Sequence, residues 1–166
     1  AQLGRVQQAL EDFQRAHNIY RDLGEARSQA AALMGIGTIY NEAGDYPRVL
    51  QYYAQAADVF AGDPSLDLST HNNRGNALRD LGRFQEAEAE YRLALAAAQK
   101  LGSQVLVARI LTNIAAAQER SGQLAQAEAV VTRGLRIAQQ PTTADWQPFL
   151  WGVQARIDYR RGDLDG

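Results

Sequence analysis

Residues 73–87 read NRGNALRDLGRFQEA, and the fold prediction starts from this stretch. At its centre Gly82 follows an apparent helix and is followed by one polar residue and then one apolar residue. The same order recurs in the chain at intervals of 38–40 residues, after Gly4, Gly44, Gly122 and Gly162. Self-similarity at a fixed period of this length is the sequence signature of a repeat array.

Small residues follow each of the first four glycines at nearly fixed distances. Ala87 and Ala94 follow Gly82 by five and twelve residues, with the bulky Tyr91 between them. Since seven residues are about two helical turns, both alanines lie on one face of a helix. We expect this face to approach a neighbouring helix closely and the bulky residue to fill the space beside it. The equivalent residues in the other copies are Ala9, Phe13 and Ala16; Val49, Tyr53 and Ala56; Ala127, Val131 and Gly134.

Each unit is therefore predicted to be a helix, a tight glycine turn and a second helix. Before the turn at Gly44, the residues Leu33, Ile36, Gly37 and Tyr40 have the i, i+3, i+4, i+7 spacing of an amphipathic helix. A second set of glycines, or Gln140–Pro141 in the last unit, closes each unit. The pattern predicts eight helices, over residues 5–22, 26–43, 46–61, 66–81, 84–101, 103–121, 124–139 and 144–161.

The stretch 73–87 closely resembles the core of a tetratricopeptide repeat, and residues 37–46 resemble it again. The resemblance covers essentially the whole chain, although the usual period is about 34 residues. Longer units are similar to those of kinesin light chains, spindle-orientation adaptors and bacterial signalling activators. The resemblance implies an all-α, right-handed superhelical solenoid of antiparallel helix pairs. The predicted division is a half-repeat 1–24, repeats 25–62, 63–102 and 103–141, and a half-repeat 142–166.

Composition argues against several classes of function. The chain has 166 residues, a formal net charge of −2 and no cysteine, so a nucleic-acid-coating surface and thiol chemistry are not expected. No apolar run is long enough to span a bilayer. The two histidines, His17 and His71, occupy positions that other copies fill with apolar residues. We therefore predict a non-catalytic protein without cofactor or metal, without nucleic-acid or membrane partners, and located in the cytoplasm.

Three polar positions on the second full repeat carry further expectations. His71 and Arg74 depart from the family pattern, which places apolar residues there. Glu88, like its neighbour Glu86, is expected to face water on a helix and to be solvated. We therefore expect no catalytic carboxylate pair on this helix.

Stacked helix pairs form a superhelix whose first helices line a concave surface. The resemblance identifies the groove-facing positions, which include Asp80, Glu119 and Arg120, and eight of the polar residues at these positions are the predicted contacts. An asparagine amide can donate and accept hydrogen bonds with an extended peptide backbone, and arginine can bind a carboxylate through two parallel hydrogen bonds. The groove is therefore predicted to bind an extended, acidic peptide, unless its arginines simply solvate the helices. The candidate contacts are Asn72, Asn73, Asn76, Arg79, Arg109, Asn113, Arg156 and Arg160.

Two other functions fit the same sequence. The chain could be a regulatory sensor arm of a larger signalling or transcription-regulating protein, with a small molecule or signalling peptide in its groove. It could also be a purely structural assembly arm.

Because the chain starts inside a repeat, we expect it to be a fragment. Its apolar ends, with Val6 and Phe13 at the start and Phe149 and Trp151 near the finish, predict head-to-tail self-association.

Overall fold

The computed structural model describes residues 2–162 as an array of helices, with side chains described for residues 4–162. Within this part of the chain there is no strand, and the all-α prediction is confirmed. A short 3-10 helix, Ala144–Trp146, precedes the last α-helix. The α-helices are α1 (Gln2–Asp22), α2 (Ala26–Glu42), α3 (Tyr46–Val59), α4 (Pro64–Asp80), α5 (Phe84–Lys100), α6 (Gln104–Arg120), α7 (Leu124–Ile137) and α8 (Gln147–Arg161).

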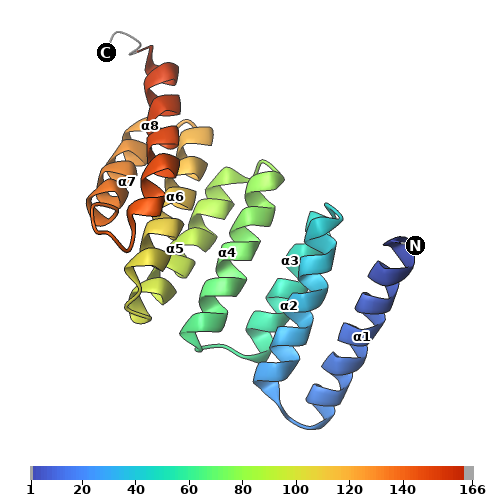
Figure 1. Ribbon diagram of the computed structural model, residues 1–166. Coiled ribbons are helices and arrows are strands. Elements are labelled where there is room, and N and C mark those ends of the chain that lie inside the picture. Colours follow the sequence, from blue (N-terminus) through green and yellow to red (C-terminus); the bar gives the residue numbers. More distant parts are fainter. Residues whose placement is uncertain (1, 163–166) are drawn as a thin grey trace.

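Successive helices pack antiparallel against one another, and the chain forms a right-handed superhelical solenoid, as predicted. In Figure 1 the even-numbered helices α2, α4, α6 and α8 form one layer and the odd-numbered helices form the other, with α1 and α8 at opposite ends of the array. α6 and α8, which are neighbours within the even layer, also contact each other directly. The assignment of 1–24 and 142–166 as half-repeats stays a prediction. Residues 163–166, with the last two residues of the fifth glycine pattern, lie outside the described part.

The turn between α4 and α5 shows why glycine recurs at this position. Gly82 has a φ of +76°, in the left-handed region that side chains with a Cβ rarely adopt. Its N–H donates to the carbonyl of Arg79 at 2.9 Å, and the N–H of Arg83 donates to the carbonyl of Leu78 at 2.8 Å. These two bonds form a Schellman motif, which satisfies carbonyls left free at the end of α4.

The close contact between α4 and α5 is built around Tyr91. The side chains of Tyr91, Ala87 and Ala94 are fully buried, as their spacing predicted. On α4, Gly75 faces the tyrosine ring so closely that a Cβ added there would lie 2.5 Å from the Cε1 atom of Tyr91. The phenol hydroxyl donates a hydrogen bond of 2.8 Å to Oδ1 of Asn76. A glycine, a buried aromatic ring and an amide therefore fix how these two helices pack.

Glu88 corrects one expectation, because it is buried rather than solvated. Nε2 of Gln118 on α6 donates to Glu88 at 2.7 Å, and Arg92 forms an ion pair with it at 2.6 Å. The neighbouring Glu86 is exposed and pairs with Arg83, so the expectation holds for that residue. Sequence spacing alone did not distinguish the two, because only Glu88 faces the following helix.

His71 and Arg74, which depart from the family pattern, share one carboxylate. Nδ1 of His71 lies 2.8 Å from Oε2 of Glu90, and a terminal nitrogen of Arg74 lies 3.0 Å from Oε1 of the same group. Glu90 lies on α5, so the three polar groups join the two helices where other repeats use apolar contacts. The polar substitutions are thus compensated across the α4–α5 pair.

Candidate functional site

The eight predicted contact residues all lie on α4, α6 and α8, within the even-numbered layer. Three of them form a chain of amide hydrogen bonds, which we call the amide ladder: Asn113, Asn72 and Asn73. Nδ2 of Asn113 on α6 donates to Oδ1 of Asn72 on α4 at 3.0 Å. Nδ2 of Asn72 donates in turn to Oδ1 of Asn73 at 3.4 Å. The structure therefore links these residues across two consecutive repeats.

The amide ladder leaves complementary groups at its two ends. Asn113 uses an N–H, so its carbonyl oxygen can still accept, whereas Asn73 uses its carbonyl, so its NH2 group can still donate. All three side chains are partly accessible. A donor and an acceptor on adjacent helices match the N–H and C=O groups of an extended peptide backbone.

Asn76 and Arg109 lie apart from the ladder bonds. Oδ1 of Asn76 accepts the hydrogen bond from Tyr91, so this oxygen keeps one of its two acceptor positions and the NH2 group keeps both donors. The Nε atom of Arg109 is buried and has no hydrogen-bond partner among the described residues. A buried donor without a partner is costly, and bound ligand or water would relieve that cost.

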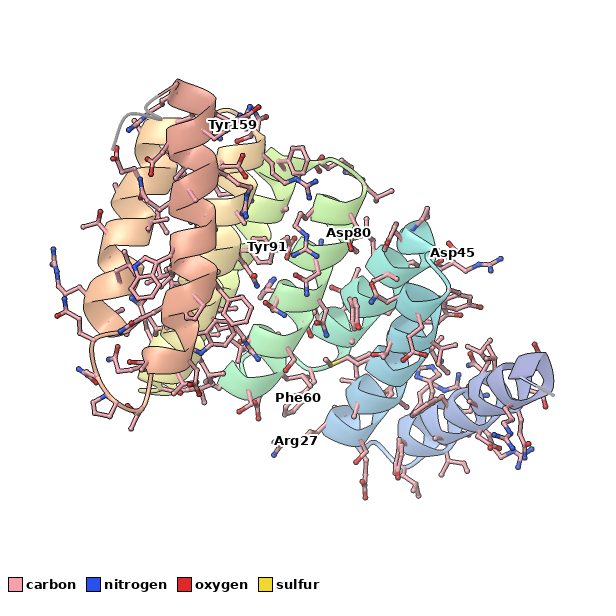
Figure 2. All side chains as sticks on the ribbon, turned by 45° about the horizontal axis from the view of Figure 1, so that its top comes forward. Arg27, Asp45, Phe60, Asp80, Tyr91 and Tyr159 are labelled. Carbon is pink, nitrogen blue, oxygen red and sulfur yellow. The ribbon has the colours of Figure 1, made fainter. Side chains whose placement is uncertain are left out.

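The other three candidates, Arg79, Arg156 and Arg160, converge at the C-terminal ends of α4, α6 and α8. They help to line a cleft of about 630 Å³, which we call the arginine cleft. Figure 2 shows two residues that mark this side of the array, Asp80 at the end of α4 and Tyr159 near the end of α8. The arginine cleft is lined by Arg79, Asp80, Phe84, Ala116, Glu119, Arg120, Arg156 and Arg160.

A buried carboxylate organises one side of the arginine cleft. Glu119 on α6 is only 4% exposed. Its carboxylate accepts from Nε of Arg156 and from Nη1 of Arg160, each at 3.1 Å, and its backbone carbonyl also accepts from Arg160. Both arginines come from α8. Glu119 therefore fixes two guanidinium groups of one repeat against the preceding repeat.

The remaining arginines of the cleft are also held in place. Nε of Arg79 donates to Asp80 at 2.9 Å. The guanidinium carbon of Arg120 lies 5.4 Å from the centre of the Phe84 ring, a cation–π distance. Burial lowers the pKa of Arg79, but the hydrogen bond to Asp80 and nearby charges outweigh it, so the net shift is upward. Arg79 therefore stays charged at every physiological pH.

The predicted contacts omitted Glu119, Arg120 and Phe84, although Glu119 and Arg120 were among the positions expected to face the groove. The repeat spacing could have identified the contacts of Glu119, because Arg156 and Arg160 follow it by 37 and 41 residues, about one repeat. Residues one repeat apart lie side by side on adjacent first helices, so an acid at one position and arginines at the other are placed to pair. The repeat register identifies such pairs, whereas residue type alone does not.

Within the described residues, no group of three or more histidines, cysteines or acids is arranged to hold a metal ion. No helix in the same part of the chain is long and apolar enough to cross a membrane. The polar chemistry of the even-numbered layer is that of amides, guanidinium groups and carboxylates. These are groups for binding other polar molecules.

Comparisons with known proteins agree with this architecture. A family model described as "Tetratricopeptide repeat" matches residues 1–61 and 66–140. No curated protein sequence matches the chain.

Solved structures share the fold at low sequence identity. BtubC (BKLC) from P. vanneervenii is 17% identical with a TM-score of 0.75, and the match covers 96% of this chain and 68% of BtubC. The apo form of RapI is 16% identical with a TM-score of 0.77, over 99% of this chain and 58% of RapI. A putative kinesin light chain of Podosopora anserina with nearly identical repeats is 20% identical with a TM-score of 0.77, over 98% and 82% of the two chains. At these identities the similarity shows the fold alone.

Proposed function

Because the chain belongs to the tetratricopeptide repeat family, we propose that it is a scaffold that binds an extended, acidic peptide against its even-numbered helices. Proteins of this fold generally bind protein or peptide partners and are typically not enzymes. The finer statement, that the peptide is extended and acidic, rests on the side chains of α4, α6 and α8.

The amide ladder is the observation that carries the proposal. It places a free carbonyl at Asn113 and a free NH2 group at Asn73 on adjacent helices. An extended peptide presents alternating N–H and C=O groups, so it can satisfy both at once. Such contacts fix the backbone direction of a ligand without reading its side chains, which suits a scaffold.

Arginines supply the preference for acidic sequences. Arg109 lies on α6 with the amide ladder, and the arginine cleft lies farther along α4, α6 and α8. The chain as a whole has a net charge of −2, so this concentration of positive charge is local. A peptide lying along the even layer with acidic side chains would neutralise it.

Replacing Asn113 or Arg109 with alanine should weaken binding of a labelled, acidic, degenerate peptide pool. The melting temperature should stay at that of the parent for Arg109→Ala, and Asn113→Ala should lose no more stability than the one hydrogen bond to Asn72 contributes, about 1 kcal/mol. For Asn113→Ala we expect a loss of about tenfold, from a net hydrogen-bond contribution near 1 kcal/mol and the loss of the ladder. The loss should persist in about 0.5 M salt. The loss for Arg109→Ala should shrink under the same conditions, because salt screens charge–charge attraction. Fluorescence anisotropy at low and high salt measures both.

Arg133→Ala is the matched control, because Arg133 is an exposed arginine on α7, in the opposite layer. It should bind the pool as the parent does. If Asn113→Ala and Arg109→Ala also bind as the parent does, the peptide does not lie on the even-numbered layer and the proposal is wrong.

The ends of the array suggest a second contact, between copies of this chain. Trp151 on α8 is 55% exposed, whereas Leu111 at the equivalent position of α6 is 1% exposed. Phe13 on α1 is 37% exposed, whereas the equivalent Tyr91 on α5 is fully buried. α8 is a first helix and α1 is a second helix. The α8 of one copy and the α1 of another could therefore pack as α4 packs against α5.

We expect this head-to-tail contact to produce concentration-dependent association, detectable by light scattering. The contact is heterologous, so it adds copies in a line rather than closing a dimer. Trp151→Glu should abolish association by placing a charge in the contact, whereas the exposed Leu93→Glu on α5 should not. A strict monomer at every concentration would rule the contact out.

A further inference from the structure

The arginine cleft has more positive charge than a carboxylate ligand requires. Four arginines line it, Arg79, Arg120, Arg156 and Arg160, against the two carboxylates of Asp80 and Glu119. The lining therefore has a net charge of +2, within a chain whose net charge is −2. A ligand group with one negative charge would leave the cleft positively charged.

The guanidinium groups are oriented by contacts that leave much of each group free. Arg79 and Arg156 are each held through Nε, by Asp80 and Glu119 respectively. Both terminal nitrogens of these groups are left for a ligand, and they make no other hydrogen bond within residues 2–162. Arg120 is positioned by the ring of Phe84 and uses no N–H in that contact. The free N–H groups are thus preorganised, which lowers the entropic cost of binding.

These arginines come from three different helices: Arg79 from α4, Arg120 from α6, and Arg156 with Arg160 from α8. A carboxylate has two oxygens and one guanidinium fork can satisfy both. A phosphoryl group has three acceptor oxygens arranged in space and a charge of about −1.5 to −2 at neutral pH. Guanidinium groups approaching from several helices match the second kind of group in charge and in number of acceptors. A volume of about 630 Å³ accommodates a phosphorylated side chain with neighbouring residues.

We propose that the arginine cleft is a phosphoryl-binding subsite, which receives a phosphoserine or phosphothreonine of the peptide that lies along the even-numbered helices. The placement on a peptide rests on the proposed function, whereas recognition of the phosphoryl group rests on the cleft itself. Phosphorylation of the partner would then strengthen its binding to this scaffold.

Three labelled degenerate peptide pools that differ only at their centre test the proposal. The centre is phosphoserine in the first pool, two adjacent glutamates in the second and serine in the third. The glutamate pair matches the charge of phosphoserine but not its shape. We expect the phosphoserine pool to bind about tenfold more tightly than the glutamate pool. The double variant Arg79→Gln/Arg120→Gln should remove this difference. The control Arg133→Gln should preserve it. Arg120→Gln alone, at an exposed position, should reduce the difference even if the double variant fails to fold.

Titration with O-phospho-L-serine, followed by NMR of the arginine Nε–Hε groups, tests the subsite without a peptide. The signals of the four cleft arginines should shift, and that of Arg133 should not. Equal binding of the phosphoserine and glutamate pools would overturn the phosphoryl subsite and leave the acidic-peptide proposal intact. Shifts with phosphoserine but no binding of any pool would support the subsite and count against the peptide scaffold. No shift at the cleft arginines would overturn the subsite.

Discussion

Gly75→Ala should lower the free energy of unfolding by about 1–3 kcal/mol. The added Cβ would lie 2.5 Å from Cε1 of Tyr91 and 2.7 Å from Cδ1. The ring cannot move away easily, because it is fully buried and its hydroxyl is bonded to Asn76. Overpacking of this kind costs about 1–3 kcal/mol, and loss of the Asn76 bond adds about 1 kcal/mol. The higher helix propensity of alanine offsets up to about 1 kcal/mol of this cost. Urea unfolding followed by circular dichroism measures the change.

Gly152→Ala is the matched control, because Gly152 also lies within a helix of the even layer. The nearest group to its added Cβ would be a terminal nitrogen of Arg156, at 3.9 Å. With space available, alanine should stabilise α8 by up to about 1 kcal/mol through its higher helix propensity. Two variants with the same sign and size of effect would show that helix propensity, and not contact with Tyr91, determines the result.

The unfolding free energy should also fall between pH 10 and pH 12 because of Tyr91. Burial raises the pKa of its phenol to about 12, while nearby Arg79 partly opposes the shift. In the unfolded chain the phenol ionises near pH 10. Between these values the unfolded state loses a proton that the folded state keeps, so rising pH favours unfolding. Below pH 10 the stability contributed by the un-ionised Tyr91 phenol is fully present. Two pKa units correspond to about 2–3 kcal/mol lost by pH 12.

Urea unfolding at a series of pH values tests this dependence on the parent and on Tyr91→Phe. The variant should be less stable near neutral pH, by about 1 kcal/mol for the lost hydrogen bond, but its stability should fall less steeply above pH 10. Tyr159→Phe, which removes an exposed phenol on α8, is the control and should follow the parent. Parallel curves for the parent and Tyr91→Phe would contradict the assignment.

The fold could be predicted from the sequence because the same residue requirements recur in each repeat. The turn at Gly82 requires a residue that can adopt a left-handed backbone conformation, and the close helix contact requires small side chains at Ala87 and Ala94. Because every repeat has the same turn and the same contact, both requirements appear in the sequence at a fixed period. A single glycine or alanine would have carried little information. The helix ends differ from the predicted ones by three residues or fewer at each described end, since capping depends on bonds that spacing does not reveal.

The side-chain pairing in the candidate site could be predicted only in part. Groove-facing positions follow from the repeat register, and Asn72 and Asn113, which form a hydrogen bond, both occupy such positions. The roles of Glu88 and Glu119 did not follow from residue type, because burial of a carboxylate depends on which partner the next helix presents. Gln118 donates a hydrogen bond to Glu88, whereas Arg156 and Arg160 donate to Glu119. Charge burial is a property of neighbouring repeats taken together.

The two tryptophans of this chain, Trp146 and Trp151, both lie at its C-terminal end, in the 3-10 helix and in α8. At the other end, α1 has no buried side chain among its described residues. In a linear array each repeat is stabilised only by its neighbours, so the two ends can open independently. Tryptophan fluorescence therefore observes one end of the molecule and does not report fraying of α1. Amide hydrogen exchange, which observes every helix, is the method that can resolve the order of opening along the array.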